Sequence, residues 1–290
     1  MKFEKKLAAI AAVSTLVFTA MTAQAADWSD TSISWRKGNK FAEPFDKNDI
    51  SKNILNLSHI SGYKYGTNFV SVDMLYSDSK DPSAYKSTNG ASEVYIVYRN
   101  TVEFSKAIGG SYKFGPVKDI GATFGFDTNT KTDETYNSKK RMWVFGPTFM
   151  LDVPGFLNVS VLELWESNQP SGWSYFSGST FSTPRYSYQT HPMLSAAWGI
   201  PIASGFSFEG FMDYIAAKGK NEFGGATKPE TNFDAEIMAD VGQFAGGPKG
   251  TFKAGIEYQF WKNKFGNDYA GAAGNGAFAK TPMVRVEYHF

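Results

Sequence analysis

The stretch that decides the fold is the last one, residues 281–290, which reads TPMVRVEYHF. Successive side chains of a strand point to opposite faces, so one face carries Val, Val, Tyr and Phe and the other carries Met, Arg, Glu and His. A soluble domain usually finishes in a frayed polar tail. The final strand of a membrane barrel must instead pair with the first, because an open sheet edge in lipid leaves backbone groups unsatisfied. The ending therefore favours a closed barrel in a membrane.

Residues 1–25 have the three parts of a secretory signal peptide. Lys2, Lys5 and Lys6 form a basic start, residues 7–18 are an apolar run, and residues 23–25 read Ala-Gln-Ala, an A-x-A cleavage site. The alternative is a membrane-spanning helix, but the run is short for one and is interrupted by polar residues. We expect cleavage after residue 25, which leaves residues 26–290 as a single barrel domain.

Composition excludes several classes of protein. The chain has 290 residues, no Cys, 29 Lys and Arg, and 28 Asp and Glu. Removing residues 1–25 takes away three Lys and one Glu and leaves a net charge of about −1, so no basic excess points to a nucleic-acid partner. The mean hydropathy of −0.32, without a second long apolar run, excludes a helical membrane bundle. It does not exclude a barrel, whose strands are only half apolar.

Alternation of apolar and polar residues recurs along the whole chain and predicts strands. The predicted strands are residues 31–37, 53–65, 69–77, 93–104, 117–128, 140–152, 156–167, 187–202, 206–217, 232–241, 251–261 and 281–290. Their number is about twelve and even, as single-chain outer-membrane barrels require. Residues 53–65 and 156–167 mix apolar residues on both faces, and their phase stays open.

The connections between these strands also alternate in length. Longer ones follow the odd-numbered strands, and shorter ones, such as a tight turn at residues 66–67, follow the even-numbered strands. We interpret the Gly- and Ala-rich residues 271–276 as a flexible loop. Sorting of this kind is typical of outer-membrane barrels with periplasmic termini and extracellular long loops. The sequence thus predicts an all-β, transmembrane, antiparallel up-and-down β-barrel of about 12 strands.

In such a barrel the apolar faces meet lipid and the charged faces meet an aqueous lumen. A soluble sandwich would show the same alternation, so the prediction depends on the signal peptide, the ending, the loop sorting and the even count together. A Lys or Arg facing lipid at the bilayer midplane costs about 2–4 kcal/mol, which agrees with the scarcity of charge on the apolar faces. Five Trp near predicted strand ends suit aromatic girdles, although sheet packing uses Trp as well; they are Trp35, Trp143, Trp165, Trp198 and Trp261.

The charged face supplies the candidate functional residues, and acids outnumber bases in it. The predicted lumen-facing set is Asp73, Glu93, Arg99, Glu103, Asp119, Asp127, Glu209, Asp213, Asp234, Glu236, Asp240, Lys253, Glu257, Arg285 and Glu287. One interpretation is a hydrated cross-strand network that keeps the wall rigid. The other is a selectivity surface that disfavours anions and accepts cations or neutral polar solutes. For any single residue the network is favoured, since charges on one face of a strand are usually just solvated. For the whole set of residues the pore is favoured.

Catalytic chemistry finds little support. The chain has three His, at 59, 191 and 289, and metal ligands at a recognisable spacing are missing. The Gly-rich stretch near residue 247 is no phosphate loop, because Pro248 stands where Lys would be needed. We predict no enzyme activity, no cofactor and no metal.

Residues 112–119, Tyr-Lys-Phe-Gly-Pro-Val-Lys-Asp, resemble the Phe-Gly-Pro-centred segment of the Tsx-like nucleoside-channel family of Gram-negative outer membranes. The hairpin at residues 56–78 and the terminal strand are similar in placement. The resemblance implies a monomeric twelve-stranded barrel with a narrow lumen that passes nucleosides, using aromatic rings to stack bases and ionisable groups to bind sugar hydroxyls. The strands that bear the family's binding aromatics do not match here, so no such residue is carried over.

We therefore predict an outer-membrane channel for passive diffusion of small polar solutes, with nucleosides as the leading solute. Its expected partners are that solute, outer-membrane lipid and lipopolysaccharide. The alternative is a non-conducting structural or adhesive barrel whose long outer loops bind ligands, host surfaces or phage.

Overall fold

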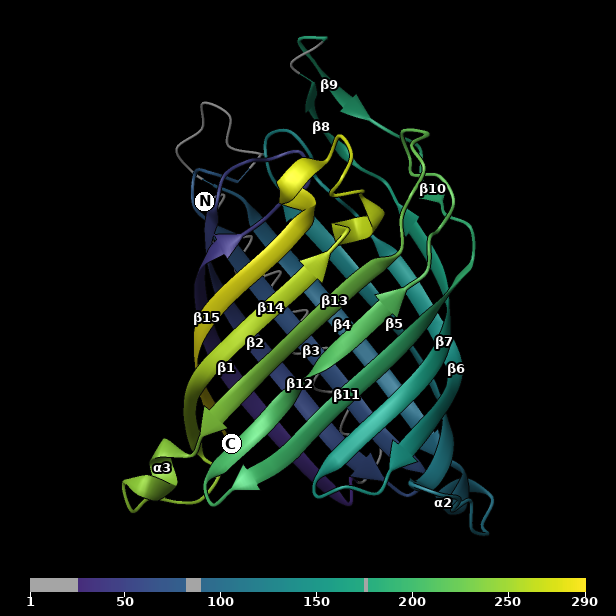
Figure 1. Cartoon of the computed structure of the whole chain (residues 1–290), viewed down its shortest axis with the longest axis vertical. Coiled ribbons are helices and arrows are strands. Elements are labelled where there is room, and N and C mark those ends of the chain that lie inside the picture. Colours follow the sequence, from purple (N-terminus) through teal and green to yellow (C-terminus); the bar gives the residue numbers. More distant parts are fainter. Residues whose placement is uncertain (1–25, 82–89, 175–176) are drawn as a thin grey trace, which may run out of the picture.

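A computed structural model of the chain describes residues 26–81, 90–174 and 177–290. The predicted signal peptide, residues 1–25, lies outside the described residues. The described chain forms a barrel of twelve long strands (Figure 1). These are β1 (Trp28–Phe41), β2 (Ile50–Tyr63), β3 (Gly66–Ser77), β4 (Ser92–Glu103), β5 (Val117–Thr132), β6 (Arg141–Leu151), β7 (Phe156–Asn168), β11 (His191–Ala203), β12 (Phe206–Ile215), β13 (Glu230–Ala239), β14 (Phe252–Lys262) and β15 (Phe278–His289).

The remaining elements are short and belong to connections. They are α2 (Phe104–Ala107), β8 (Ser171–Ser174), β9 (Ser179–Ser182), β10 (Tyr186–Ser187), α3 (Val241–Phe244), η2 (Lys264–Gly266) and η3 (Gly274–Ala277). Among the described residues, no helix is both long and apolar enough to cross a membrane.

The sheet closes on itself through the terminal strand. Every long strand pairs antiparallel with its neighbours in sequence, and β15 pairs with β1 from Ser32 opposite His289 to Gly38 opposite Met283. The backbone N–H of Phe290 extends this seam and donates to the carbonyl of Thr31 at 2.9 Å. The predicted all-β, twelve-stranded, antiparallel up-and-down barrel is confirmed, and the last stretch of sequence does what its pattern indicated.

One predicted turn is displaced by two residues. The β2–β3 hairpin turns at Lys64 and Tyr65, and Gly66 is already the first residue of β3. A Cβ atom on Gly66 would lie 1.9 Å from the carbonyl oxygen of Thr101 on β4. Gly66 is therefore needed for close strand approach and not for the turn.

The connections gather at two ends of the barrel (Figure 1). One end, which we call the long-loop end, carries residues 42–49, 78–81, 90–91, 133–140, 169–174, 177–190, 216–229 and 263–277. The other, the short-turn end, carries residues 64–65, 104–116, 152–155, 204–205 and 240–251 together with the C-terminus. Two of these latter connections contain α2 and α3 and are not short, so the length sorting is weaker than the sequence suggested.

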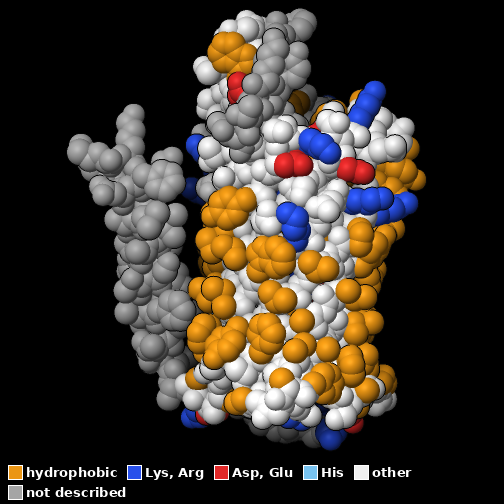
Figure 2. All heavy atoms as spheres, turned by 90° about the vertical axis from the view of Figure 1, so that its left-hand side faces the viewer, with side chains coloured by type: hydrophobic (Ala, Val, Ile, Leu, Met, Phe, Trp, Pro, Cys, Tyr) orange, Lys and Arg blue, Asp and Glu red, His pale blue; other side chains and the backbone are white. Residues whose placement is uncertain are grey.

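The distribution of side chains is the reverse of that in a soluble protein. On β14 and β15, Ile256 is 65% exposed and Val284 52% exposed, whereas the neighbouring Glu257 is only 3% exposed. Figure 2 shows the hydrophobic side chains as a band over the outer surface, with Lys and Arg above it toward the long-loop end. In water these apolar side chains would stay exposed, whereas the hydrocarbon core of a membrane would bury them. The barrel is built to span a membrane.

The two strands of open phase are explained by apolar clusters inside the barrel. Ile50 and Ile54 of β2 pack inside with Met283 of β15. Leu162 and Leu164 of β7 form a second inner cluster with Val144 of β6 and Met193 of β11. Because both faces of β2 and β7 carry apolar residues, alternation alone could not tell the inside from the outside.

Because apolar side chains face outward and charged ones face inward, substitution by Arg should have different effects on the two faces of β14. Ile256→Arg should lower the free energy of unfolding by about 2–4 kcal/mol, because it places a cation in lipid. Gln259→Arg is the matched control, since Gln259 points inward and donates to Asp234 at 3.1 Å. Urea unfolding in liposomes measures both, and equal losses for the two variants would contradict the assignment of faces.

Candidate functional site

Two arginines link the inner face of six consecutive strands, from β13 to β3. Nη1 of Arg36 on β1 lies 3.0 Å from Oε1 of Glu257 on β14, and Nη2 pairs with Asp73 on β3. Arg285 on β15 lies 3.3 Å from the other oxygen of Glu257 and 2.5 Å from Glu236 on β13. This row of charges crosses the seam at which β1 meets β15, so it fastens the closure from the inside.

The row continues along β15 toward the short-turn end. Glu287 lies 2.5 Å from Nη2 of Arg285 and 2.7 Å from Nε2 of His289. The other ring nitrogen of His289 lies 2.9 Å from Asp30 on β1. His289 points inward, as its place in the alternation predicts.

The opposite wall is held by a second set of polar contacts. Arg99 on β4 pairs with Asp127 on β5 at 2.5 Å, and the hydroxyl of Tyr95 donates to the same carboxylate at 3.0 Å. A row of hydroxyl groups then crosses β4 to β7: Thr101 to Thr123 at 2.7 Å, Thr123 to Thr148 at 2.5 Å, and Thr148 to Ser160 at 2.8 Å. Polar groups that face an enclosed space are thus satisfied by one another.

The eleven residues with which we predicted a pore all lie on strand positions that face the interior. They are Asp73, Arg99, Glu103, Asp119, Glu209, Asp213, Glu236, Lys253, Glu257, Arg285 and Glu287. Near the short-turn end, Glu103 pairs with Lys106 at 2.9 Å and Glu209 with Lys253 at 3.4 Å. Asp213 differs from them because it lies opposite Ser195 of β11 and has no ion-pair partner within the distance of a salt bridge among the described residues. That these residues line a pore stays a proposal.

Two predictions of where a side chain points are wrong. Asp240 follows the end of β13 and caps α3, where its two oxygens accept from the backbone N–H groups of Gln243 at 3.0 Å and Gly250 at 2.6 Å. Trp261 does not join an outer girdle. It lies on the inner face of β14, and its indole N–H donates to Glu230 at 2.5 Å.

Sequence reasoning missed Arg36, the central cation of the inner row. Its signal is visible once the strand is known, because Ser32, Ser34 and Arg36 alternate with Ile33 and Trp35.

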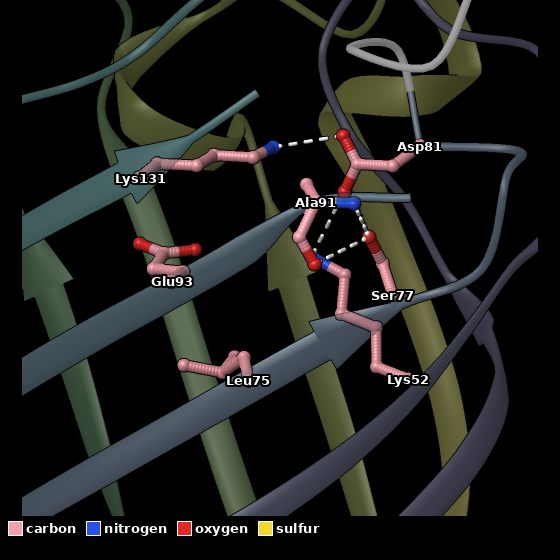
Figure 3. A pocket seen from close by; sticks show the side chains of 7 residues that line it. All are labelled: Lys52, Leu75, Ser77, Asp81, Ala91, Glu93 and Lys131. Carbon is pink, nitrogen blue, oxygen red and sulfur yellow. Dashed lines mark hydrogen bonds and ion pairs between the residues drawn. The ribbon is translucent and has the colours of Figure 1, made fainter. Parts of the chain in front are cut away.

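At the long-loop end, a buried ion cluster joins several loops above the barrel wall. Glu43 of the first loop lies 2.6 Å from Nζ of Lys52 and 3.1 Å from Nζ of Lys264 in the last loop. Lys131 at the end of β5 lies 2.9 Å from Asp81, and Figure 3 shows its amino group reaching that carboxylate across the pocket that Lys52 also lines. Burial alone would raise the pKa of Glu43, but the three lysines outweigh it and hold the pKa well below its usual value.

A second cluster lies at the same end, above β7. Glu166 accepts from Lys218 at 2.8 Å and pairs with Lys140 at 3.1 Å. Glu222 accepts from the hydroxyl of Tyr188 at 2.6 Å and from Tyr136. Burial raises the pKa of Glu222, yet these hydroxyl donors outweigh it and lower the pKa. These bonds join residues 133–140, 186–190 and 216–229.

The last loop, residues 263–277, reaches across the barrel mouth. Asn263 and Phe265 adopt left-handed conformations, with φ of 53° and 61°, and the N–H of Phe265 donates to Glu230 at 3.1 Å. Nζ of Lys140, beside β6, lies 4.3 Å from the ring centroid of Phe265, although four strands separate β6 from β14 by the shorter way round the barrel. Strained backbone of this kind often marks functional sites.

The Gly- and Ala-rich stretch is therefore not a freely flexible loop. The carbonyl of Ala273 accepts from the N–H of Phe45 in the first loop at 3.0 Å. A Cβ atom on Gly276 would lie 2.0 Å from the carbonyl oxygen of Glu43. Small residues are needed here because two loop backbones are in contact.

A cavity of about 370 Å³ lies at the short-turn end of the barrel. Its lining includes Phe156 on β7, Glu209 on β12 and Lys253 on β14. The two ends therefore differ, with packed loops covering one and a cavity open at the other.

Comparison with known proteins finds a likeness of shape only. No protein-family model matches it, and no curated protein matches its sequence. Similar solved structures include the KdgM porin (12% identity, 89% of this chain and 99% of that one, TM-score 0.42) and the COG4313 outer membrane channel from Pseudomonas putida F1 (9%, 90% and 95%, 0.46). A third is the translocator domain of autotransporter NalP from Neisseria meningitidis (12%, 99% and 98%, 0.43). Likeness at this level does not extend to what the proteins do.

The chain's own geometry defines its class. It is a closed twelve-stranded transmembrane β-barrel with an ion-paired interior and a mouth covered by its own long loops. The resemblance to Tsx-like nucleoside channels stays a prediction.

Removing the central cation should destabilise the barrel strongly. Arg36→Gln leaves Asp73 without its ion pair and Glu257 with Arg285 alone, and loss of one member of a buried pair costs about 3–5 kcal/mol. Lys106→Gln is the control, since its exposed pair with Glu103 should cost less than about 1 kcal/mol. Urea unfolding in liposomes measures both, and a loss for Arg36→Gln no larger than that of the control would contradict the role of the inner row.

The cluster around Glu43 should make the loop cover sensitive to acid. Because the folded pKa of Glu43 is lowered, its stabilisation is present above its ordinary pKa of 4.5 and is lost as the pH falls below that value. Hydrogen exchange of residues 42–49 and 263–277, corrected for intrinsic rates, should therefore accelerate in acid. In the Glu43→Gln variant these residues should exchange quickly already at neutral pH, and their exchange should not accelerate further in acid. If exchange in the variant still accelerated in acid as it does in the parent protein, the acid sensitivity would belong to another group.

Proposed function

We propose that this protein is an outer-membrane channel for passive diffusion of small polar solutes, and that it favours cations and neutral solutes over anions. The observation that carries the proposal is the charge of the enclosed inner face. Apart from the clusters at its two ends, three guanidinium groups stand against seven carboxylates there, namely Arg36, Arg99 and Arg285 against Asp73, Asp127, Asp213, Asp234, Glu236, Glu257 and Glu287. Charged rings inside a pore select ions of the opposite sign.

Ion pairing limits how much of this charge a solute would meet. Arg36 and Arg285 are each engaged by two or three carboxylates, so they offer little attraction to anions. Two of the seven carboxylates have no cation paired directly with them within the described chain. Of these, Asp234 accepts a hydrogen bond from Gln259 at 3.1 Å, so Asp213 is the one that we expect a solute to meet. The proposal gives Asp213 the largest effect on selectivity.

Nucleosides are the solute that we propose first, on the resemblance of residues 112–119 to the Tsx-like segment. Cellular orientation is part of the same proposal, with the short-turn end in the periplasm and the long-loop end outside. The packed loops favour a second candidate, a non-conducting barrel that presents its loops to an outside ligand.

Planar bilayers separate the two candidates. A channel should give discrete conductance steps and, in a KCl gradient, a reversal potential of the sign expected for cation preference. Asp213→Asn should reduce that preference, while Glu103→Gln, which lies near the short-turn end beside Lys106, should change it little. Absence of steps from protein that keeps its folded electrophoretic mobility would favour the non-conducting barrel.

The solute is tested separately. Nucleosides should swell proteoliposomes and reduce the single-channel current, and sugars of similar size serve as the control. Conductance without any nucleoside effect would support the channel but exclude nucleosides as its solute.

A further inference from the structure

We propose that the outer rim of β6 and β7 is a binding site for the phosphate group of a membrane lipid, formed by Arg141 and Arg185 above Trp143 and Trp165. This inference rests on the barrel spanning a membrane and on the proposed orientation, with the long-loop end outside, but not on its conducting solutes. The lipid is one whose phosphate lies at the long-loop surface, such as a phosphorylated glycolipid of lipid A type.

The arginines of this chain fall into two groups. The chain has five, and the three that point into the barrel, Arg36, Arg99 and Arg285, each pair with a carboxylate. Arg141 and Arg185 have no carboxylate partner among the described residues. An unpaired guanidinium at a membrane surface attracts anions. The lack of a partner for the two outer arginines therefore points to an anionic ligand that the chain itself does not supply.

The two outer arginines are held beside one another. Arg141, the first residue of β6, lies directly opposite Ser167 of β7, and Ser187 of β10 lies opposite Ser167 on its other side (strands in Figure 1). Nη1 of Arg185 donates to the hydroxyl of Ser167 and to the carbonyl of Lys139, both at 3.1 Å. These bonds fix the guanidinium group and leave its Nε and Nη2 edge without a hydrogen bond in the described chain.

Electrostatics agrees with this placement. Some burial and then the positive charge of Arg141 lower the pKa of Arg185. Two like charges are thus held together without a counter-ion. A planar guanidinium fork suits bidentate binding of phosphate, and two adjacent forks suit it better than one.

The surface below the arginines is suited to lipid. Trp143 and Trp165 lie opposite one another, are 61% and 46% exposed, and lie two residues from Arg141 and Ser167 on the same outer face. Phe126 on β5 extends this patch, with its ring centroid 5.7 Å from that of Trp143. Indole rings settle at the boundary between headgroups and hydrocarbon, so the arginines lie at the height of lipid phosphates.

A free phosphate ion would not need this arrangement. The site faces outward, over an aromatic surface that only acyl chains would cover. The outward carboxylate on the same strand, Glu163, is four residues from Ser167, roughly 13 Å along β7, and leaves the arginines uncompensated. By contrast, Lys262 and Lys280 at the rim of β14 and β15 already lie over Tyr269 and Phe278, at 5.2 and 4.4 Å from the ring centroids.

Native mass spectrometry of the folded barrel in detergent tests the site. The probes are a bis-phosphorylated lipid A, the same lipid after removal of its phosphates, and inorganic phosphate as competitor. The double variant Arg141→Gln with Arg185→Gln should bind the phosphorylated lipid roughly tenfold more weakly. The matched control, Lys262→Gln with Lys280→Gln, removes the same charge from the other rim and should change binding by less than about twofold.

Three results would overturn the proposal. Equal losses in both double variants would show general attraction to basic rims, and equal binding of the dephosphorylated lipid would exclude phosphate recognition. Full displacement by inorganic phosphate would make this a free-anion site. Folded mobility on gels and unchanged unfolding in urea verify that the arginine variant keeps its structure. Conductance is measured separately. A negative result for lipid binding therefore does not contradict the proposed channel, and absence of conductance does not contradict the lipid site.

Discussion

The structure depends on one constraint, that in hydrocarbon every backbone N–H and C=O must find its partner within the chain. The pairing of β15 with β1 meets it, because an open sheet would leave two unpaired edges in lipid. Closure also divides space into an inside and an outside. Once that division exists, alternation along each strand assigns every side chain to lipid or to the interior.

The enclosed interior imposes a second requirement. A charge that cannot reach bulk water has to be paired, since an isolated buried ion is costly. Arg36 and Arg285 meet this need by linking Asp73, Glu257 and Glu236 across the seam. Apolar clusters around Ile54 and Leu164 fill other parts of the same space. The interior is therefore a stabilised wall as well as a candidate path, and both follow from one set of residues.

Ion pairing also distinguishes structural charges from those available to ligands. Glu43 and Glu166 are surrounded by lysines and hold the loops at the long-loop end. Asp213 inside, and Arg141 with Arg185 on the outer rim, lack such partners in the described chain. To these uncompensated groups we assign solute selectivity and lipid binding.

The sequence by itself determined the strands, their number, the closing role of residues 281–290 and the inward position of most predicted charges, because a period of two is local and readable in any window. It could not determine the phase of β2 and β7, where inner apolar clusters make both faces alike. The partners of Arg36, the inward turn of Trp261 and the crossing of the mouth by residues 263–277 were decided only by the tertiary structure. They join residues far apart in the chain, and the register of the closed sheet, which no local pattern encodes, brings those residues together.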